Sequence, residues 1–147
     1  NDHLFFRKVE VVSEDPIIVV YRSAIDRKLI RRLTKALENG KMEELKIIGD
    51  TEVNANAEIR RANGTWMPNY SSAESMEIYF SLQRLLLPLD LHSAEPFQIL
   101  SYAKGGFYVP HTDFINEQRA GNLNLKISGN RIATAIISLR RAKRGGG

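Results

Sequence analysis

The segment from Tyr102 to Phe114 constrains the fold and chemistry of this chain more than any other stretch. It contains Gly105-Gly106, where the backbone can turn with positive φ, followed by His111 and Asp113 two residues apart. In an extended segment, alternate side chains point to the same face. An imidazole nitrogen and a carboxylate oxygen at this spacing can therefore converge on one metal ion.

The His-x-Asp pair alone predicts only part of a metal site. Non-haem iron(II) oxygenases use two histidines and one carboxylate, which leaves coordination positions open for a substrate acid and O2. Such a pair also occurs by chance in loops and caps, so it is weak evidence without further residues. A third ligand would have to come from elsewhere in the sequence.

Length and composition favour one compact domain. The chain has 147 residues, of which 43% are apolar, and it has no cysteine from which a redox compartment could be inferred. Its net charge is +4, but four basic residues gather in Arg140-Arg141-Ala142-Lys143-Arg144, and the remainder is nearly neutral. The charge therefore predicts no nucleic-acid-binding face. No apolar run reaches the roughly 18 residues of a membrane span.

Two stretches have the apolar spacing of helices. The first is expected from Ser23, with Ser23 and Asp26 as a capping box, to Gly40. The second is expected from Ala73 to Leu87, where Pro88 prevents continuation. We expect its apolar residues to be core; they are Met76, Tyr79, Phe80, Leu82, Leu86 and Leu87.

Runs rich in β-branched and aromatic residues predict strands. They are Phe5–Val12, Ile17–Tyr21, Leu45–Ile48, Pro96–Tyr102 and Arg131–Leu139. We expect Tyr102 and His111 to lie on neighbouring strands joined by a tight connection at the two glycines. Helices early and strands late favour an α+β fold, with helices packed against one sheet.

Two further segments have open interpretations. Arg60 and Trp66 can face the same side if their segment is extended, but a buried tryptophan with the arginine in solvent fits equally well. Phe114–Asn130 is long and polar, which is typical either of a lid over the candidate metal site or of disorder.

Taken together, these motifs resemble the collagen-type prolyl 4-hydroxylase alpha subunit catalytic domain. The residues that carry the resemblance are Tyr102, Gly105, Gly106, Tyr108, Pro110, His111, Asp113 and Phe114, with Gly129–Thr134, Ala94-Glu95, Gln98, Arg60 and Trp66. The resemblance runs from about Val9 to the end of the chain. Phe107 departs from it, since that position often carries glutamine in those enzymes.

The resemblance implies a double-stranded β-helix, or jelly roll, braced by N-terminal helices and incomplete at the C-terminus. Residues 1–147 would form a single partial dioxygenase domain, with strands and helices in 1–95 and the first half of the jelly roll in 96–147. It also implies hydroxylation of peptidyl proline with Fe(II), 2-oxoglutarate, O2 and ascorbate. The implied partners are a proline-rich or collagen-like peptide and a disulfide isomerase subunit, and the implied compartment is the endoplasmic reticulum lumen.

The resemblance assigns a role to each candidate residue. His111 and Asp113 would bind iron, and Tyr102 would hydrogen-bond the distal carboxylate of 2-oxoglutarate. The implied peptide-binding residues are Arg60, Trp66, Tyr108 and Arg131, with Glu95 as a weaker candidate. Asn63-Gly-Thr and Asn69-Tyr-Ser are glycosylation sequons, which would matter only in a secretory lumen.

The resemblance also implies a second iron histidine and a 2-oxoglutarate-binding basic residue further along than Gly147. His3 and His92 are the only other histidines, and neither matches that position. We expect residues 1–147 to be a fragment of a longer enzyme rather than a natural truncation, because a domain seldom ends with an exposed sheet edge. Alone, this fragment would be poorly stable and inactive.

Two other functions are alternatives to the dioxygenase. The first is a non-catalytic relative that binds proline-rich peptides or acts like a chaperone. In it the groove would still be formed by Arg60, Trp66, Tyr108 and Arg131, without metal turnover. An RNA-binding module would rest on the basic Arg140–Gly147 segment alone, which has no nearby aromatic platform.

Overall fold

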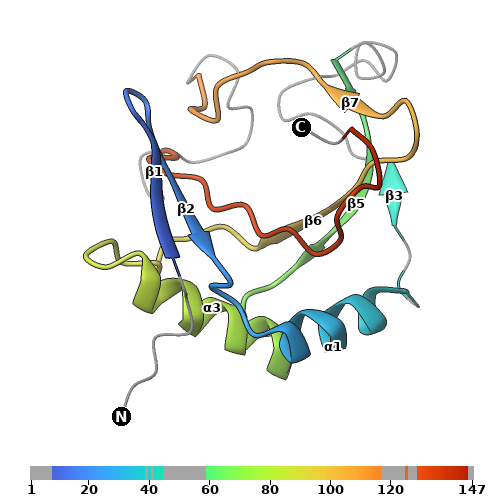
Figure 1. The fold of residues 1–147 in the computed structure, drawn as a ribbon, viewed down its shortest axis with the longest axis horizontal. Coiled ribbons are helices and arrows are strands. Elements are labelled where there is room, and N and C mark those ends of the chain that lie inside the picture. The colour runs from blue at the N-terminus through green and yellow to red at the C-terminus, as the bar shows by residue number, and fades with distance from the viewer. Residues whose placement is uncertain are drawn as a thin grey trace. The chain divides into compact units, whose positions relative to one another are not determined.

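The computed structural model describes residues 8–38, 40, 42–44, 59–116, 125 and 129–145 (Figure 1). The chain divides into two compact units, residues 1–40 with 67–96, and residues 41–66 with 97–147. Within the described residues, no helix is long and apolar enough to cross a membrane.

The first unit begins with an antiparallel hairpin of β1 (Lys8–Glu14) and β2 (Ile17–Arg22). Asp15 and Pro16 form the turn, and the register shifts between Val11 and Ser13. Both predicted strands are confirmed over the described residues. Cross-strand pairing is reinforced by Arg22, whose Nη2 lies 3.0 Å from an oxygen of Glu10.

The helix α1 (Arg27–Glu38) begins later than the sequence predicted. Asp26 accepts a hydrogen bond from the backbone N–H of Lys28 at 2.7 Å, so Asp26 rather than Ser23 caps this helix. Ser23 has a φ of 57° and lies outside the helix. Leu29 and Leu33 are buried, as their helical spacing predicted.

The helix α3 (Ala73–Leu85) begins where predicted and ends two residues early. Ser72 and Ser75 form a reciprocal capping box. The predicted apolar face is wrong in part, because Phe80 is 51% exposed whereas Ile78 is only 2% exposed. Of the other predicted core residues, Tyr79 is buried and Met76 and Leu87 are exposed.

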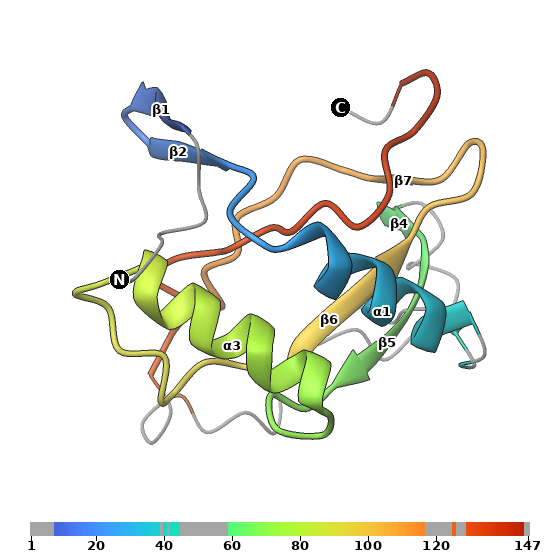
Figure 2. The same cartoon turned by 60° about the horizontal axis from the view of Figure 1, so that its bottom comes forward.

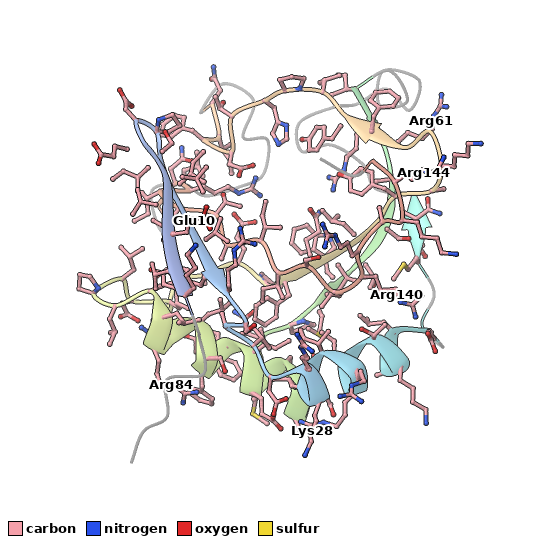
Figure 3. All side chains as sticks on the ribbon, viewed as in Figure 1. Glu10, Lys28, Arg61, Arg84, Arg140 and Arg144 are labelled. Carbon is pink, nitrogen blue, oxygen red and sulfur yellow. The ribbon has the colours of Figure 1, made fainter. Side chains whose placement is uncertain are left out.

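The helices α1 and α3 pack against each other within this unit, as both views show (Figures 1 and 2). Arg32 of α1 donates to Glu77 of α3 at 2.6 Å and to Glu74 at 3.3 Å. The hydrogen bond that Arg32 donates to Glu77 is the main cause that raises the pKa of Arg32. Lys28 and Arg84 lie on the exposed sides of their helices (Figure 3).

The second unit contains two small sheets. One has the order β3 (Glu43–Glu44), β5 (Asn63–Met67) and β6 (Phe97–Ser101), and the other pairs β4 (Arg60–Arg61) with β7 (Phe107–Tyr108). The predicted strand Pro96–Tyr102 is confirmed as β6. The predicted strand Leu45–Ile48 lies outside the described residues, as does most of the candidate lid Phe114–Asn130.

Two strand predictions are wrong. Tyr102 and His111 do not lie on neighbouring strands, because β6 pairs with β5 whereas β7 pairs with β4. Arg131–Leu139 is in no ladder. Within this segment, Ile132 and Ile136 are 86% and 89% exposed. β-branched composition favours an extended backbone, but a strand also needs a partner offering free N–H and C=O groups.

The described residues thus form a mixed α and β structure with small antiparallel sheets and no closed barrel. The predicted α+β class is confirmed at this level. The double-stranded β-helix stays a prediction.

Candidate metal centre

The ladder between β4 and β7 positions the candidate site. Arg60 lies opposite Tyr108 and Arg61 opposite Phe107, and the N–H of Val109 continues the pairing to the carbonyl of Ile59 at 2.9 Å. Directly opposed residues share a face, and successive residues alternate faces. The guanidinium carbon of Arg60 is 4.7 Å from the Tyr108 ring centroid on one face. That of Arg61 is 5.7 Å from the centroid of the Phe107 ring on the other face.

Gly106 allows the two strands to approach each other. A Cβ at this position would lie 2.8 Å from the Arg61 carbonyl oxygen and 2.9 Å from that of Ala103. Both atoms belong to the backbone and cannot rotate away. The preceding Gly105 has a φ of 78°, a conformation that glycine adopts without strain. The Gly-Gly pair therefore serves as the predicted turn, although it leads into β7, which pairs with β4 rather than with β6.

Arg60 is buried, with 5% of its surface exposed. Its Nη2 donates to Oε1 of Gln98 at 3.3 Å, whereas its Nε has no hydrogen-bond partner within the described part of the chain. Trp66 is 46% exposed. This excludes the alternative of a buried tryptophan with the arginine in solvent, because Arg60 is the buried residue and Trp66 is the exposed one.

The ring of His111 is held from two sides. Its Nδ1 lies 2.9 Å from the carbonyl oxygen of Val109, and its ring stacks on Tyr108 with centroids 3.7 Å apart and an angle of 23°. A carbonyl oxygen can only accept, so Nδ1 carries a proton. In the neutral imidazole, Nε2 then holds the lone pair that a metal requires.

The two oxygens of Asp113 have different partners. Oδ1 lies 3.4 Å from Nε2 of His111, and Oδ2 accepts a hydrogen bond from the hydroxyl of Thr134. The side chains of His111 and Asp113 are 38% and 40% exposed. Nε2 and Oδ1 therefore face each other at a half-exposed position that a solute can reach.

The spacing of this donor pair is compatible with both atoms binding one first-row divalent metal ion. Nitrogen and oxygen ligands lie about 2.0–2.2 Å from a first-row divalent ion such as zinc, so two donors of one ion cannot be more than about 4.4 Å apart. The 3.4 Å between Nε2 and Oδ1 satisfies that limit. Among the described residues, no group of three His, Cys, Asp or Glu side chains is placed to hold a metal. The described part of the site supplies two donors.

Asn130 ties the segment before Thr134 to the segment after Asp113. Its Oδ1 accepts from the N–H of Ile115 at 2.9 Å and of Arg131 at 2.8 Å, and its Nδ2 donates to the carbonyl of Ile115 at 2.7 Å. The amide side chain thus satisfies both backbone groups of Ile115, as a strand partner would.

Comparison with known proteins finds similarity to several prolyl 4-hydroxylases. The chain is 25% identical over 143 residues to prolyl 4-hydroxylase subunit alpha-2 of Caenorhabditis elegans, covering 95% of this chain and 26% of that protein. It is 29% identical over 140 residues to prolyl 4-hydroxylase subunit alpha-1 of Gallus gallus, covering 95% and 24%. It is 27% identical over 143 residues to probable prolyl 4-hydroxylase 7 of Arabidopsis thaliana, covering 95% and 42%.

These similarities support a relationship with the prolyl 4-hydroxylases. The chain spans about a quarter of the length of the two alpha subunits and about two fifths of the plant protein. No protein-family model and no solved structure matches the chain at significance.

The remaining residues that the prolyl 4-hydroxylase resemblance singled out are more dispersed. Tyr102 directly follows β6 and is 46% exposed. Within the described residues, no hydrogen bond or ring contact joins it to His111 or Asp113. Arg131 is half-buried and follows Asn130. Glu95 is exposed and belongs to the first unit.

Sequence reasoning missed two side chains that shape the centre. Thr134 lies within the predicted strand Arg131–Leu139 and Asn130 lies immediately before it, and the sequence alone assigns neither to the site. Thr134 interrupts the apolar part of the predicted strand, Ile132–Ile137, and Asn130 is a polar residue just before the strand. That interruption is the signal that could have identified them.

Proposed function

We propose that this chain is part of a prolyl 4-hydroxylase-type dioxygenase that hydroxylates peptidyl proline with Fe(II), 2-oxoglutarate, O2 and ascorbate. The observation that carries the proposal is the 3.4 Å approach of His111 Nε2 to Asp113 Oδ1, with Nδ1 and Oδ2 engaged elsewhere. The similarity to prolyl 4-hydroxylases of animals and a plant supports it.

His111 and Asp113 would hold the iron, and Tyr102 would donate a hydrogen bond to the distal carboxylate of 2-oxoglutarate. Bound iron and 2-oxoglutarate together supply the O2 chemistry, and ascorbate supplies reducing equivalents. The hydrogen bond from Nδ1 of His111 to the Val109 carbonyl leaves the metal-binding lone pair on Nε2 of the neutral imidazole. Ring stacking with Tyr108 restricts the rotation of the imidazole.

Exposed aromatic side chains support a proline-rich peptide as substrate, because polyproline II segments dock on aromatic surfaces. Trp66 and Tyr102 are each 46% exposed, and Phe107 is 36% exposed. The proposed peptide-binding residues are Arg60, Trp66, Tyr108, Arg131 and Glu95. Since Arg60 is buried against Tyr108, its proposed role is to support that ring.

The fold and setting of the proposal follow the same resemblance. Residues 1–147 would be one partial dioxygenase domain whose small sheets belong to a double-stranded β-helix. A disulfide isomerase subunit and the endoplasmic reticulum lumen complete the proposal as its partner and compartment.

We further propose that these residues supply two of the protein's metal ligands and that the isolated chain does not turn over. The sequence holds three histidines. Neither His3 nor His92 matches the position of the second iron histidine that the resemblance implies. A facial triad with one histidine missing binds metal weakly and lacks a ligand that tunes it.

Anaerobic titration of the 147-residue chain with Fe(II) tests the metal site. We expect weak binding that His111→Ala and Asp113→Ala abolish and that the exposed control His92→Ala retains. Equal binding by all four proteins would contradict the proposal. Assays of 2-oxoglutarate decarboxylation should show none, and turnover by this chain would contradict the two-ligand assignment.

A proline-rich peptide titration tests the substrate class. We expect the wild-type chain to bind the peptide and Trp66→Ala to bind it more weakly. A scrambled control peptide with alanine in place of proline should not bind. Peptide binding by a chain that takes up no Fe(II) would favour the non-catalytic relative instead.

A further inference from the structure

The two glycosylation sequons of the chain lie in different structural settings. Asn63-Gly64-Thr65 belongs to β5, whereas Asn69-Tyr70-Ser71 belongs to the turn before α3. The glycan that a sequon accepts is bulky and has to lie at the surface of the folded chain. The contacts of the two asparagine side chains therefore decide which of them can carry a glycan.

The amide of Asn69 is engaged in the fold. Its Nδ2 donates to the carbonyl oxygen of Ala94 at 3.3 Å, and its Oδ1 is buried with no hydrogen-bond partner in the described part of the chain. Because a carbonyl oxygen can only accept, the contact with Ala94 identifies which atom of this amide is the nitrogen. The Ser71 hydroxyl of the same sequon donates to the carbonyl of Pro68 at 2.8 Å.

The planarity of the amide excludes a sugar at Asn69 in this fold. In a trans secondary amide the remaining N–H points away from the C=O group, and the carbon on nitrogen lies on the side of the oxygen. The first sugar on Nδ2 would therefore lie beside Oδ1, and this oxygen is buried at Asn69. A glycan at Asn69 would have to displace the atoms that cover Oδ1.

Asn63 meets neither obstacle. Its side chain is exposed, and among the described residues no hydrogen bond engages the side chain of Asn63 or of Thr65. The backbone of Asn63 is paired with Glu44 of β3, so the strand is held while the amide remains at the surface. Asn63 and Trp66 are three residues apart in β5 and project from opposite faces. A glycan at Asn63 would therefore leave the face of Trp66 open to a peptide.

We propose that Asn63 carries an N-linked glycan in the folded chain and that Asn69 carries none. The inference rests on the proposed function through its secretory compartment, where a lipid-linked oligosaccharide diphosphate is the sugar donor. Nδ2 of Asn63 forms a bond to C1 of the first sugar as the C1–O bond to the diphosphate breaks. The diphosphate leaves with the bonding electron pair, and Nδ2 loses one proton to a base of the transferase.

Expression of the 147-residue chain behind a cleavable signal peptide in insect cells tests the inference. The soluble chain from the lumen and the medium is treated with peptide N-glycosidase in heavy-oxygen water, which converts each glycosylated asparagine to a labelled aspartate. We expect peptide mass spectra to place the label at Asn63 and not at Asn69. On gels, the enzyme should shift the wild type and the matched control Asn69→Gln by one glycan, and Asn63→Gln by none.

A label at Asn69 in the soluble chain, with or without one at Asn63, would overturn the inference, and so would the absence of a label at both. If Asn69→Gln fails to fold because the contact with Ala94 is lost, Ser71→Ala removes the same sequon and keeps that contact. Ser71→Ala should still shift by one glycan, and no shift would contradict the assignment to Asn63.

The result is independent of the test of the proposed function. Because the signal peptide supplies entry to the lumen, a chain without a glycan would overturn the inference and leave the metal site standing. Conversely, Fe(II) binding that is the same in the wild type, His111→Ala and Asp113→Ala would overturn the proposed metal site. A label at Asn63 would still identify this residue as the acceptor.

Discussion

The guanidinium carbon of Arg60 lies 4.7 Å from the centroid of the Tyr108 ring, and the two residues are directly opposed across β4 and β7. Tyr108 also stacks on His111. A single aromatic ring thus connects a buried cation to a candidate metal ligand, and its removal should loosen both.

Replacing Tyr108 by alanine should lower the free energy of unfolding by about 2 kcal/mol, because a cation–π contact contributes about 0.5–2 kcal/mol and an aromatic pair about 0.5–1.5 kcal/mol. Tyr108→Phe keeps both ring contacts and should stay within about 0.5 kcal/mol of the wild type. Urea denaturation measures both. Tyr102→Ala, which removes an exposed tyrosine, is the control, and an equal loss in Tyr102→Ala and Tyr108→Ala would contradict the prediction.

The two adjacent glycines should respond differently to alanine. Gly106→Ala places a Cβ 2.8 Å from a backbone oxygen of Arg61, so β4 and β7 must separate. We expect a loss of about 3 kcal/mol, at the upper end for overpacking. At Gly105 the space is open and only the φ of 78° opposes a side chain. That strain costs about 1–2 kcal/mol. Denaturant melts rank the pair, and a larger loss at Gly105 would contradict the steric explanation.

Asn130 offers a graded test of the side-chain link to Ile115. Asn130→Ala removes both the acceptor and the donor, and at about 1 kcal/mol per hydrogen bond it should cost about 2–3 kcal/mol. Asn130→Asp keeps an acceptor for the two N–H groups and loses the donor, so its loss should be smaller. Amide hydrogen exchange at Ile115 reports the link directly. Unchanged protection in Asn130→Ala would show that the backbone of Ile115 is held by other means.

Ser72 should stabilise α3 through its cap. Its hydroxyl accepts from the N–H of Ser75 at 3.1 Å, and Ser72→Ala should cost about 1 kcal/mol of unfolding free energy. Ser81 provides a matched serine in the same helix, whose hydroxyl bonds the carbonyl of Glu77. Ser81→Ala should be neutral or slightly stabilising, because alanine has the higher helix propensity. Similar losses in both variants would argue against a capping role.

Stability should fall in strong alkali through Tyr79. The hydrogen bond with Tyr70, followed by burial, raises the pKa of Tyr79 from 10.0 to about 12. Since the folded pKa is raised, the contribution is complete below pH 10 and is lost as the pH rises from 10 towards 12. Denaturation at a series of pH values, with tyrosinate absorbance in parallel, should show this slope. Tyr79→Phe should flatten it, and the same slope in Tyr79→Phe would assign it to other groups.

Local signals predicted local structure well. The hairpin β1–β2, the strand β6 and the start of α3 were predicted from β-branched runs, turn residues and helical apolar spacing, which act within a few residues. The start of α1 was misplaced because Ser23 and Asp26 both have capping side chains. The choice between them depends on the backbone, and Ser23 has a φ of 57°.

Burial and pairing were predicted less well. Phe80 and Ile78 are both apolar residues of α3, and only their neighbours in space decide that Phe80 is exposed and Ile78 buried. Arg131–Leu139 has the composition of a strand but lies in no ladder, because pairing depends on a partner that composition does not specify.

The sequence by itself determined the two candidate donors, His111 and Asp113, since their spacing and types are local and chemical. Only the tertiary structure decided what surrounds them: that β7 pairs with β4, that Arg60 is buried against Tyr108, and that Thr134 reaches Asp113. The physical reason is that these contacts join residues 21 or more positions apart. Chain folding brings such residues together, whereas spacing along the sequence constrains only near neighbours.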